Sequence, residues 1–158
     1  MAEAFSNKLA RAVGVVNSSA AGAIGITTNL ITGISTSGVT VGDLVDNQNY
    51  IAGTTVSSIG AGQVVVDRDS TNTSSTTSQS VKFLQPTTIY TSPGGTKTIL
   101  IGGTFANNTN SQVALTIQVL DQSEGVTVAI ASKIPVPAGS SFVISDTGKT
   151  LLEASDAI

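Results

Sequence analysis

Strict alternation of apolar and smaller or polar residues marks the C-terminal part of the chain. Residues 113–120 show it most clearly, with Leu115, Ile117 and Val119 at every second position. A period of two places such side chains on one face of a β-strand. We therefore expect these three residues to share one buried face.

More strands are predicted around this one, and turn residues separate them. Ser92-Pro93-Gly94-Gly95 is typical of a turn, and Pro135, Pro137 and Gly139 are expected to interrupt the chain. Such spacing favours a small antiparallel sandwich. The expected strands are residues 87–91, 97–105, 113–120, 126–130, 141–145 and 151–153.

Between residues 24 and 84 the apolar runs are shorter and recur about every ten residues, as in small all-β units. Residues 67–80 are almost wholly polar, so we expect an exposed loop that anchors no core. The strands expected here are residues 24–28, 30–34, 44–46, 55–59, 63–68 and 80–84.

The first 25 residues carry weaker signals. Residues 1–16 are expected to form an arm, which either turns helical or leads into a strand at residues 12–16. Residues 17–25 are small and polar and predict a linker. Phe5 and Leu9 are large apolar residues near a terminus, where disorder is the default, so we expect them to bind the parent sandwich or a neighbouring subunit.

Together these patterns predict an all-β protein: an antiparallel β-sandwich with an inserted small β domain and an N-terminal arm. The expected division is residues 1–20 for the arm and first sandwich strand, 21–85 for the inserted domain and 86–158 for the sandwich. The sandwich would need one more strand after Ile158. Either the chain continues or another segment or subunit closes the sandwich.

Composition narrows the function. The 158 residues include no Cys and no His, which excludes disulfides, thiolate nucleophiles, His-based catalysis and ordinary zinc sites. A net charge of −3 and scattered Lys and Arg argue against nucleic acid as a partner. No apolar run predicts a membrane span. We expect no cofactor and no metal.

Only 11% of residues are charged, under half the usual ~25%. Two interpretations are compatible: a compact β protein with a Ser/Thr surface, or a subunit whose surface is buried against neighbouring subunits. The second predicts a homo-oligomer.

Carboxylates are the remaining candidates for metal-binding or catalytic side chains. Asp67-Arg68-Asp69 could contribute to a calcium loop, but a charged strand end is the better interpretation because further acidic ligands are missing. A glycosidase would need only two carboxyl groups, drawn from Asp67, Asp69, Asp121 or Glu124. A catalytic cleft is not favoured in a chain with so few aromatic residues. We therefore expect that the protein is not an enzyme.

Aromatic platforms for sugars are few. Tyr50 and Tyr90 are the only tyrosines, and both lie in strand-like contexts. A lectin is therefore disfavoured, although a host-surface glycan stays open as a partner.

Two sequence blocks carry a resemblance. The first joins the arm Ala4-Phe5-Ser6-Asn7-Lys8-Leu9 to Thr87-Thr88-Ile89-Tyr90-Thr91. The second is Ile134-Pro135-Val136-Pro137-Ala138-Gly139, leading to Leu151-Leu152-Glu153-Ala154. They resemble the small β-sandwich virion proteins of tailed phages that infect marine cyanobacteria. About 65 residues separate the arm from the sandwich here, and they resemble small β modules grafted into phage surface proteins.

This resemblance implies a structural role in a virion assembled in the host cytoplasm, with capsid or other virion proteins as partners and no catalytic residues. We expect a capsid decoration or knob protein, held on the shell by its arm and sandwich, with the inserted domain facing outward. The alternative is a tail, neck or baseplate component that attaches a fibre or faces a receptor.

Overall fold

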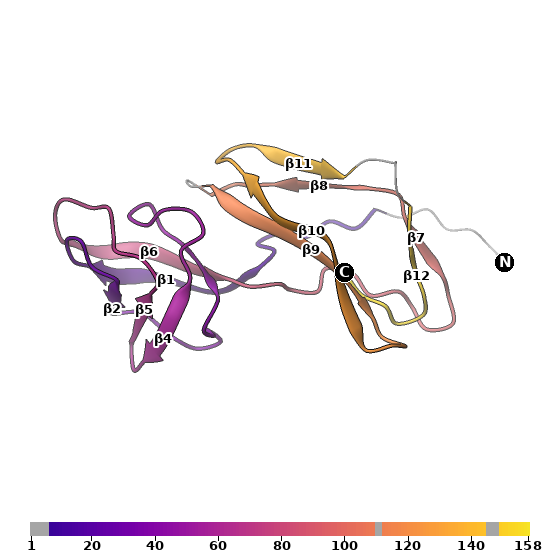
Figure 1. The fold of residues 1–158 in the computed structure, drawn as a ribbon, viewed down its shortest axis with the longest axis horizontal. Helices are drawn as coiled ribbons and strands as arrows, with labels where there is room; N and C mark the ends of the chain where they lie inside the picture. Colours follow the sequence, from indigo (N-terminus) through magenta and orange to yellow (C-terminus); the bar gives the residue numbers. More distant parts are fainter. Residues whose placement is uncertain (1–6, 110–111, 145–148) are drawn as a thin grey trace.

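The computed structural model describes residues 7–109, 112–144 and 149–158. It confirms an all-β, sandwich-like fold, with twelve strands and no helix in this part of the chain. Figure 1 shows two groups of strands, one from the first half of the chain and one from the second. The predicted Phe5 contact lies outside the described residues.

The first group is a six-stranded antiparallel sheet in the order β3-β6-β1-β2-β5-β4. Its long strands β1 and β6 lie side by side in Figure 1. The six strands are β1 (Val15–Ile24), β2 (Leu30–Thr32), β3 (Leu44–Asp46), β4 (Val56–Gly60), β5 (Gln63–Val66) and β6 (Thr76–Leu84).

The two outer strands of this sheet also meet each other. The Val45 amide donates to the Thr54 carbonyl over 2.9 Å, and the Val56 amide donates to the Asp43 carbonyl over 2.9 Å. These bonds flank a bridge between Leu44 and Thr55. The sheet therefore closes on itself, and we call residues 14–85 the barrel. Closure satisfies the edge groups that an open sheet would leave to solvent or to another chain.

Burial explains why the barrel holds together. Its apolar side chains form one cluster, and Phe83, Ile31, Val64 and Val81 within it are fully buried. Each such side chain contributes about 1.5–3 kcal/mol when removed from water. The rest of the cluster consists of Ile24, Ile34, Val39, Val45, Tyr50, Val56 and Val66.

The predicted linker at residues 17–25 is wrong, because nearly all of it belongs to β1. At Gly22 the small residue has a packing reason. A Cβ placed on Gly22 would lie 2.7 Å from Val81 Cγ2 on the neighbouring strand β6. Inside a small barrel, small residues make room for large ones opposite. The strand expected at residues 24–28 is also wrong, because β1 ends at Ile24 and residues 25–28 form no strand.

The loop expected at residues 67–80 is also shorter and better anchored than predicted. Strand β6 begins at Thr76, and Ser70 is buried. The Ser70 hydroxyl donates to the Gly25 carbonyl over 2.9 Å and accepts from the Thr28 amide over 3.1 Å. A polar residue thus fastens the loop to the barrel through hydrogen bonds instead of apolar contact.

Three two-stranded ribbons make up the C-terminal half, residues 86–158. The pairs are β9 with β10, β8 with β11 and β7 with β12, all antiparallel. The strands are β7 (Thr98–Leu100), β8 (Gly103–Ala106), β9 (Val113–Asp121), β10 (Val126–Val136), β11 (Ser141–Ile144) and β12 (Thr150–Leu152).

Three details of this half differ from expectation. Residues 87–91 form no strand, although Tyr90 and Ile158 exchange backbone hydrogen bonds. The strand expected at residues 97–105 is interrupted at Gly102, where a Cβ would lie 2.7 Å from the Ile144 carbonyl oxygen. Pro135 does not end β10, because it faces Ala114 inside the ribbon.

The barrel begins and ends at one place. Val15 pairs with Leu84, and the Gln85 amide donates to the Gly14 carbonyl over 2.8 Å. The first sandwich strand expected within residues 1–20 is therefore wrong: β1 pairs with β2 and β6, and none of the described strands of the barrel pairs with a strand of the C-terminal half. Independent folding of the predicted domains stays a prediction.

Candidate assembly surface

The two halves differ in how well they bury their apolar side chains. In the described part of the C-terminal half the buried hydrophobic residues are Ile117, Val136, Leu152 and Ala157. Ile117 is 4% exposed, as predicted, whereas Leu115 and Val119 are only half-buried. The prediction of a buried face is therefore confirmed for Ile117 only, and the chain itself covers its two neighbours incompletely.

The least covered element is the hairpin formed by β9 and β10 (Figure 1). Every residue from 122 to 130 is exposed. Within this stretch Val126 is 49%, Val128 54% and Ile130 41% exposed. Isolated two-stranded ribbons are at best marginally stable in water. This hairpin therefore exposes apolar surface that a partner could bury.

Only one edge of this hairpin is paired. The outer edge of β9 receives the C-terminal residues, because Leu120 and Ala157 exchange backbone hydrogen bonds of 2.8 and 3.0 Å. Strand β10 pairs with β9 alone among the described strands. A long, apolar, unpaired edge is a template for strand addition.

The hairpin tip is held in a defined shape. The Asp121 carboxylate accepts the Ser123 hydroxyl over 2.7 Å and the Ser123 and Glu124 amides over 3.0 Å each. These bonds favour the ionised form, so the Ser123 hydroxyl and the neighbouring amides hold the pKa of Asp121 below its usual value. The tip is therefore organised before any partner binds.

A second apolar strip lies on the other ribbons. Ile99 of β7 faces Leu151 of β12 across the ribbon, and both are exposed, as is Val143 of β11. These residues project from ribbons whose opposite faces carry the buried Leu152 and the half-buried Leu100. Their exposed fractions are similar to those of Val126, Val128 and Ile130 on the β9–β10 hairpin.

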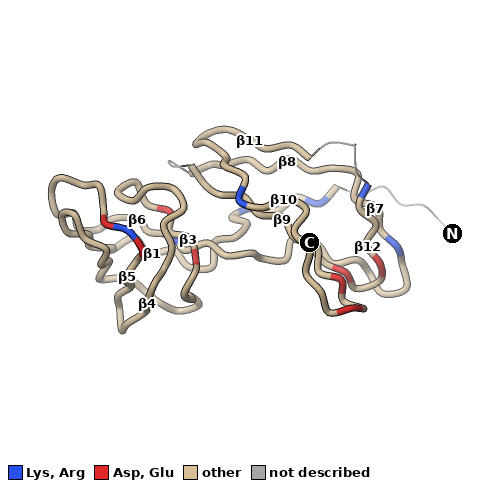
Figure 2. The backbone as a smooth tube through the Cα atoms, viewed as in Figure 1, with Lys and Arg blue, Asp and Glu red and all other residues tan. Residues whose placement is uncertain are grey.

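The four carboxylates considered for catalysis do not converge. Asp67 and Asp69 follow β5 in the barrel, whereas Asp121 and Glu124 lie at the tip of the β9–β10 hairpin. Figure 2 shows the acidic positions in separate groups, one on each half.

Two residues of the Asp67-Arg68-Asp69 segment, Asp67 and Arg68, have structural contacts. Asp67 accepts the Thr55 amide over 2.8 Å, Arg68 donates to the Ala52 carbonyl over 3.2 Å, and their side chains lie 3.7 Å apart. Both contacts fasten the loop that precedes β4. Within the described residues, no cluster of three or more acidic side chains could hold a metal ion.

Neither tyrosine offers an exposed platform for a sugar. Tyr50 is buried in the barrel, where its hydroxyl donates to the Thr28 carbonyl over 3.1 Å. Burial and, secondarily, the charge of Asp69 raise the pKa of Tyr50 to about 12. Tyr90 is half-buried, with its hydroxyl 3.1 Å from that of Thr98.

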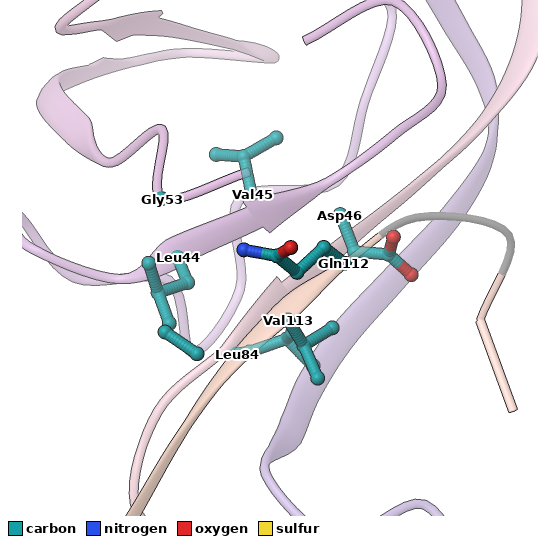
Figure 3. Close-up of a pocket in the computed structure, with 8 residues that line it drawn as sticks. Leu44, Val45, Asp46, Gly53, Leu84, Gln112 and Val113 are labelled. Carbon is teal, nitrogen blue, oxygen red and sulfur yellow. The ribbon is translucent and has the colours of Figure 1, made fainter. Parts of the chain in front are cut away.

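Of two surface hollows, one is small and the other is lined by polar side chains that bond to one another. The one in Figure 3 has a volume of about 10 Å³, space for a single water, and joins Leu44 and Leu84 of the barrel to Val113 of the other half. The other, of about 170 Å³, lies between the Asp46 and Lys82 side chains, which form an ion pair of 3.6 Å. Its Gln48 amide likewise bonds to Gln79.

Leu9, predicted to bind the parent sandwich or a neighbouring subunit, is 92% exposed in the single chain. Of the two partners expected for this residue, the parent sandwich is therefore not used, and a neighbouring subunit stays a prediction. Phe5 lies outside the described residues.

Comparison of the chain with protein-family models, curated proteins and solved structures finds no match. Within the described residues there is also no helix with the length and hydropathy that a membrane span requires.

Proposed function

We propose that this chain is a structural subunit of a tailed-phage virion, a capsid decoration protein whose C-terminal half binds neighbouring subunits while the barrel projects. One observation carries the proposal: the barrel is closed and buries its own core, whereas the C-terminal half leaves the apolar β9–β10 hairpin exposed. Because the C-terminal half leaves apolar strand residues exposed, it is suited to binding other subunits.

The resemblance of the arm and sandwich segments to phage virion proteins supports the same role. So does the composition, because a surface with few charges disfavours a freely soluble monomer. The junction at Gly14 and Gln85 supports an outward barrel, since a unit whose ends meet can project from a base without disturbing it.

Purified virions of the encoding phage provide the test. We expect the protein in numbers proportional to the major shell protein, and we expect a tag inserted at the exposed residues 73–75 to be reached by antibody on intact particles. A few copies per particle would instead support the tail, neck or baseplate alternative. Absence from the virion would overturn the structural role.

A matched pair of substitutions tests which half binds the shell. Val128→Lys, on the β9–β10 hairpin, should reduce occupancy on particles. Ile59→Lys, at an exposed apolar position of the barrel, should leave occupancy unchanged. Equal loss from both variants would contradict the assignment of the C-terminal half as the base.

A further inference from the structure

We propose that the free edge of β10 pairs antiparallel with β10 of a second copy about a two-fold axis, with Val128 facing Val128. This inference rests on the proposed assembly role and names the partner of that surface. The product is a continuous four-stranded sheet in which β10 of each copy becomes an inner strand.

The composition of the edge favours strand pairing. From Val126 to Ser132 the strand has no charged residue and no Pro. Proteins commonly protect free edges with just such residues. Here they come only afterwards, with Lys133 at a positive φ of 51° and Pro135 two residues later. The register with β9 shifts between Ala129 and Ala131 and again between Ala131 and Ile134, and such irregularities limit further pairing. The regular, unprotected stretch is therefore short, from Val126 to Ala129, and it is bounded.

Self-complementarity identifies that partner as a second copy. Centred on Val128, the two-fold axis places Val128 opposite Val128 of the second copy, so two exposed apolar residues face one another before the register shift at Ala129–Ala131 begins. Thr127 then faces Ala129 of the second copy on the other side of the sheet. Cross-strand pairs of β-branched residues stabilise a sheet, and no like charges oppose each other in this register.

Charge supports the antiparallel direction. The hairpin tip carries Asp121 and Glu124, and Lys133 follows the pairing segment at its other end. Antiparallel pairing brings Lys133 of each copy toward the acidic tip of the other. A parallel arrangement would instead place tip beside tip and bring like charges together.

The surface area is compatible with a dimer. The chain exposes 9452 Å², whereas a folded monomer of 15.8 kDa is expected to expose about 7,300 Å². Division into two bodies of equal mass would raise that expectation to about 8,800 Å². Part of the remaining ~600 Å² belongs to the exposed arm, in which Leu9 is 92% exposed, and the rest is available for a contact between copies.

Disulfide trapping tests both the partner and the register, because the chain contains no native Cys. Directly opposed residues in antiparallel strands have Cα atoms about 4.5–5.5 Å apart, which is within disulfide range. Under mild oxidation by oxidised glutathione, Val128→Cys should give covalent dimers. Val126→Cys alone should not, but a mixture of Thr127→Cys and Ala129→Cys proteins should give the mixed dimer.

The matched control is Val143→Cys on β11, which is as exposed as Val128 but lies outside the proposed contact. Trapping of Val143→Cys as fast as Val128→Cys would overturn the proposal, as would trapping of Val126→Cys alone. These outcomes concern purified protein. They are therefore separate from virion binding, which fails or succeeds on its own evidence.

Sedimentation provides the second measurement. Val128→Lys places two like charges opposite each other across the two-fold axis and should raise the dimer dissociation constant at least about tenfold. Val143→Lys should leave it unchanged. Since both positions are more than half exposed in the single chain, both variants should fold. A wild-type protein that stays monomeric at high concentration would overturn the proposal.

Discussion

The barrel and the C-terminal half have similar lengths, and both consist of antiparallel strands. They differ in whether the edge strands of their sheets are hydrogen-bonded to another strand. In the barrel, bonds between residues 42–45 and 54–56 join the two outer strands. In the C-terminal half, β10 runs eleven residues with one edge unpaired. The barrel buries Phe83 completely, whereas Phe105 and Phe142 of the other half are only half-buried.

This difference shows that closure of a sheet, more than strand content, decides whether a small unit completes its own core. A unit of about 70 residues has little apolar surface to bury. The barrel uses it efficiently because every strand has two neighbours. The ribbons of the C-terminal half each expose one or both faces, so their remaining stabilisation is expected to come from a neighbour.

Separating the halves should produce the largest effect. Expressed alone, residues 14–85 should unfold cooperatively and stay monomeric, because the barrel shares no strand with the other half. Residues 86–158 alone should show a melting temperature that rises with protein concentration, since association stabilises them. Calorimetry at several concentrations measures both. A concentration-independent C-terminal half would contradict the comparison.

Phe83→Ala should come next. Truncation of a fully buried Phe costs about 3–5 kcal/mol, because it removes apolar burial and leaves a cavity. Phe142→Ala removes a half-buried ring and should cost about half as much or less. Urea unfolding gives both free energies. Equal losses would show that the two cores are equally packed.

Gly22→Ala tests the close approach of β1 and β6. The added Cβ would lie 2.7 Å from Val81 Cγ2 and 3.1 Å from the Gln79 carbonyl oxygen, so we expect a loss of about 1–3 kcal/mol from overpacking. Gly94→Ala is the control, because a Cβ there meets nothing within 4 Å. Unchanged thermal stability of the Gly22 variant would mean that the barrel is looser than described.

Tyr50 should give the barrel an alkaline limit. Because its pKa rises from 10.0 to about 12 on folding, the stabilisation is complete below pH 10 and is lost as the pH rises toward 12. Melting temperatures of residues 14–85 between pH 8 and 12 should therefore fall, and Tyr50→Phe should reduce that fall. An identical pH profile in the Phe variant would assign the effect to other groups.

Asp121→Ala should have the smallest effect. It removes the bonds that organise the hairpin tip, while the residue itself belongs to no buried core. The lowered pKa means that this contribution is present above the ordinary value of 3.8 and is lost as the pH falls below the folded-state pKa. Amide exchange at Ser123 and Glu124 should accelerate in the variant at neutral pH. Unchanged exchange would show that the tip has other support.

The alternation of side chains along the sequence was sufficient to predict the all-β class and the positions of many strands. Residues 44–46 were predicted and observed as β3, and the alternation at residues 113–120 corresponds to β9. These predictions depend on the period of the side chains along one strand, which the sequence contains in full. The same pattern identified Ile117 as buried.

Pairing partners were decided only by the tertiary structure. The small residues of 17–25 predicted a linker, because nothing local reveals that Gly22 packs under Val81, 59 positions away. Ser70 likewise looked like loop, since its partners at Gly25 and Thr28 are distant in sequence. Closure of one sheet and the open edge of β10 depend on which strands meet in space, and hydrogen bonds between distant strands leave no periodic signal along either one.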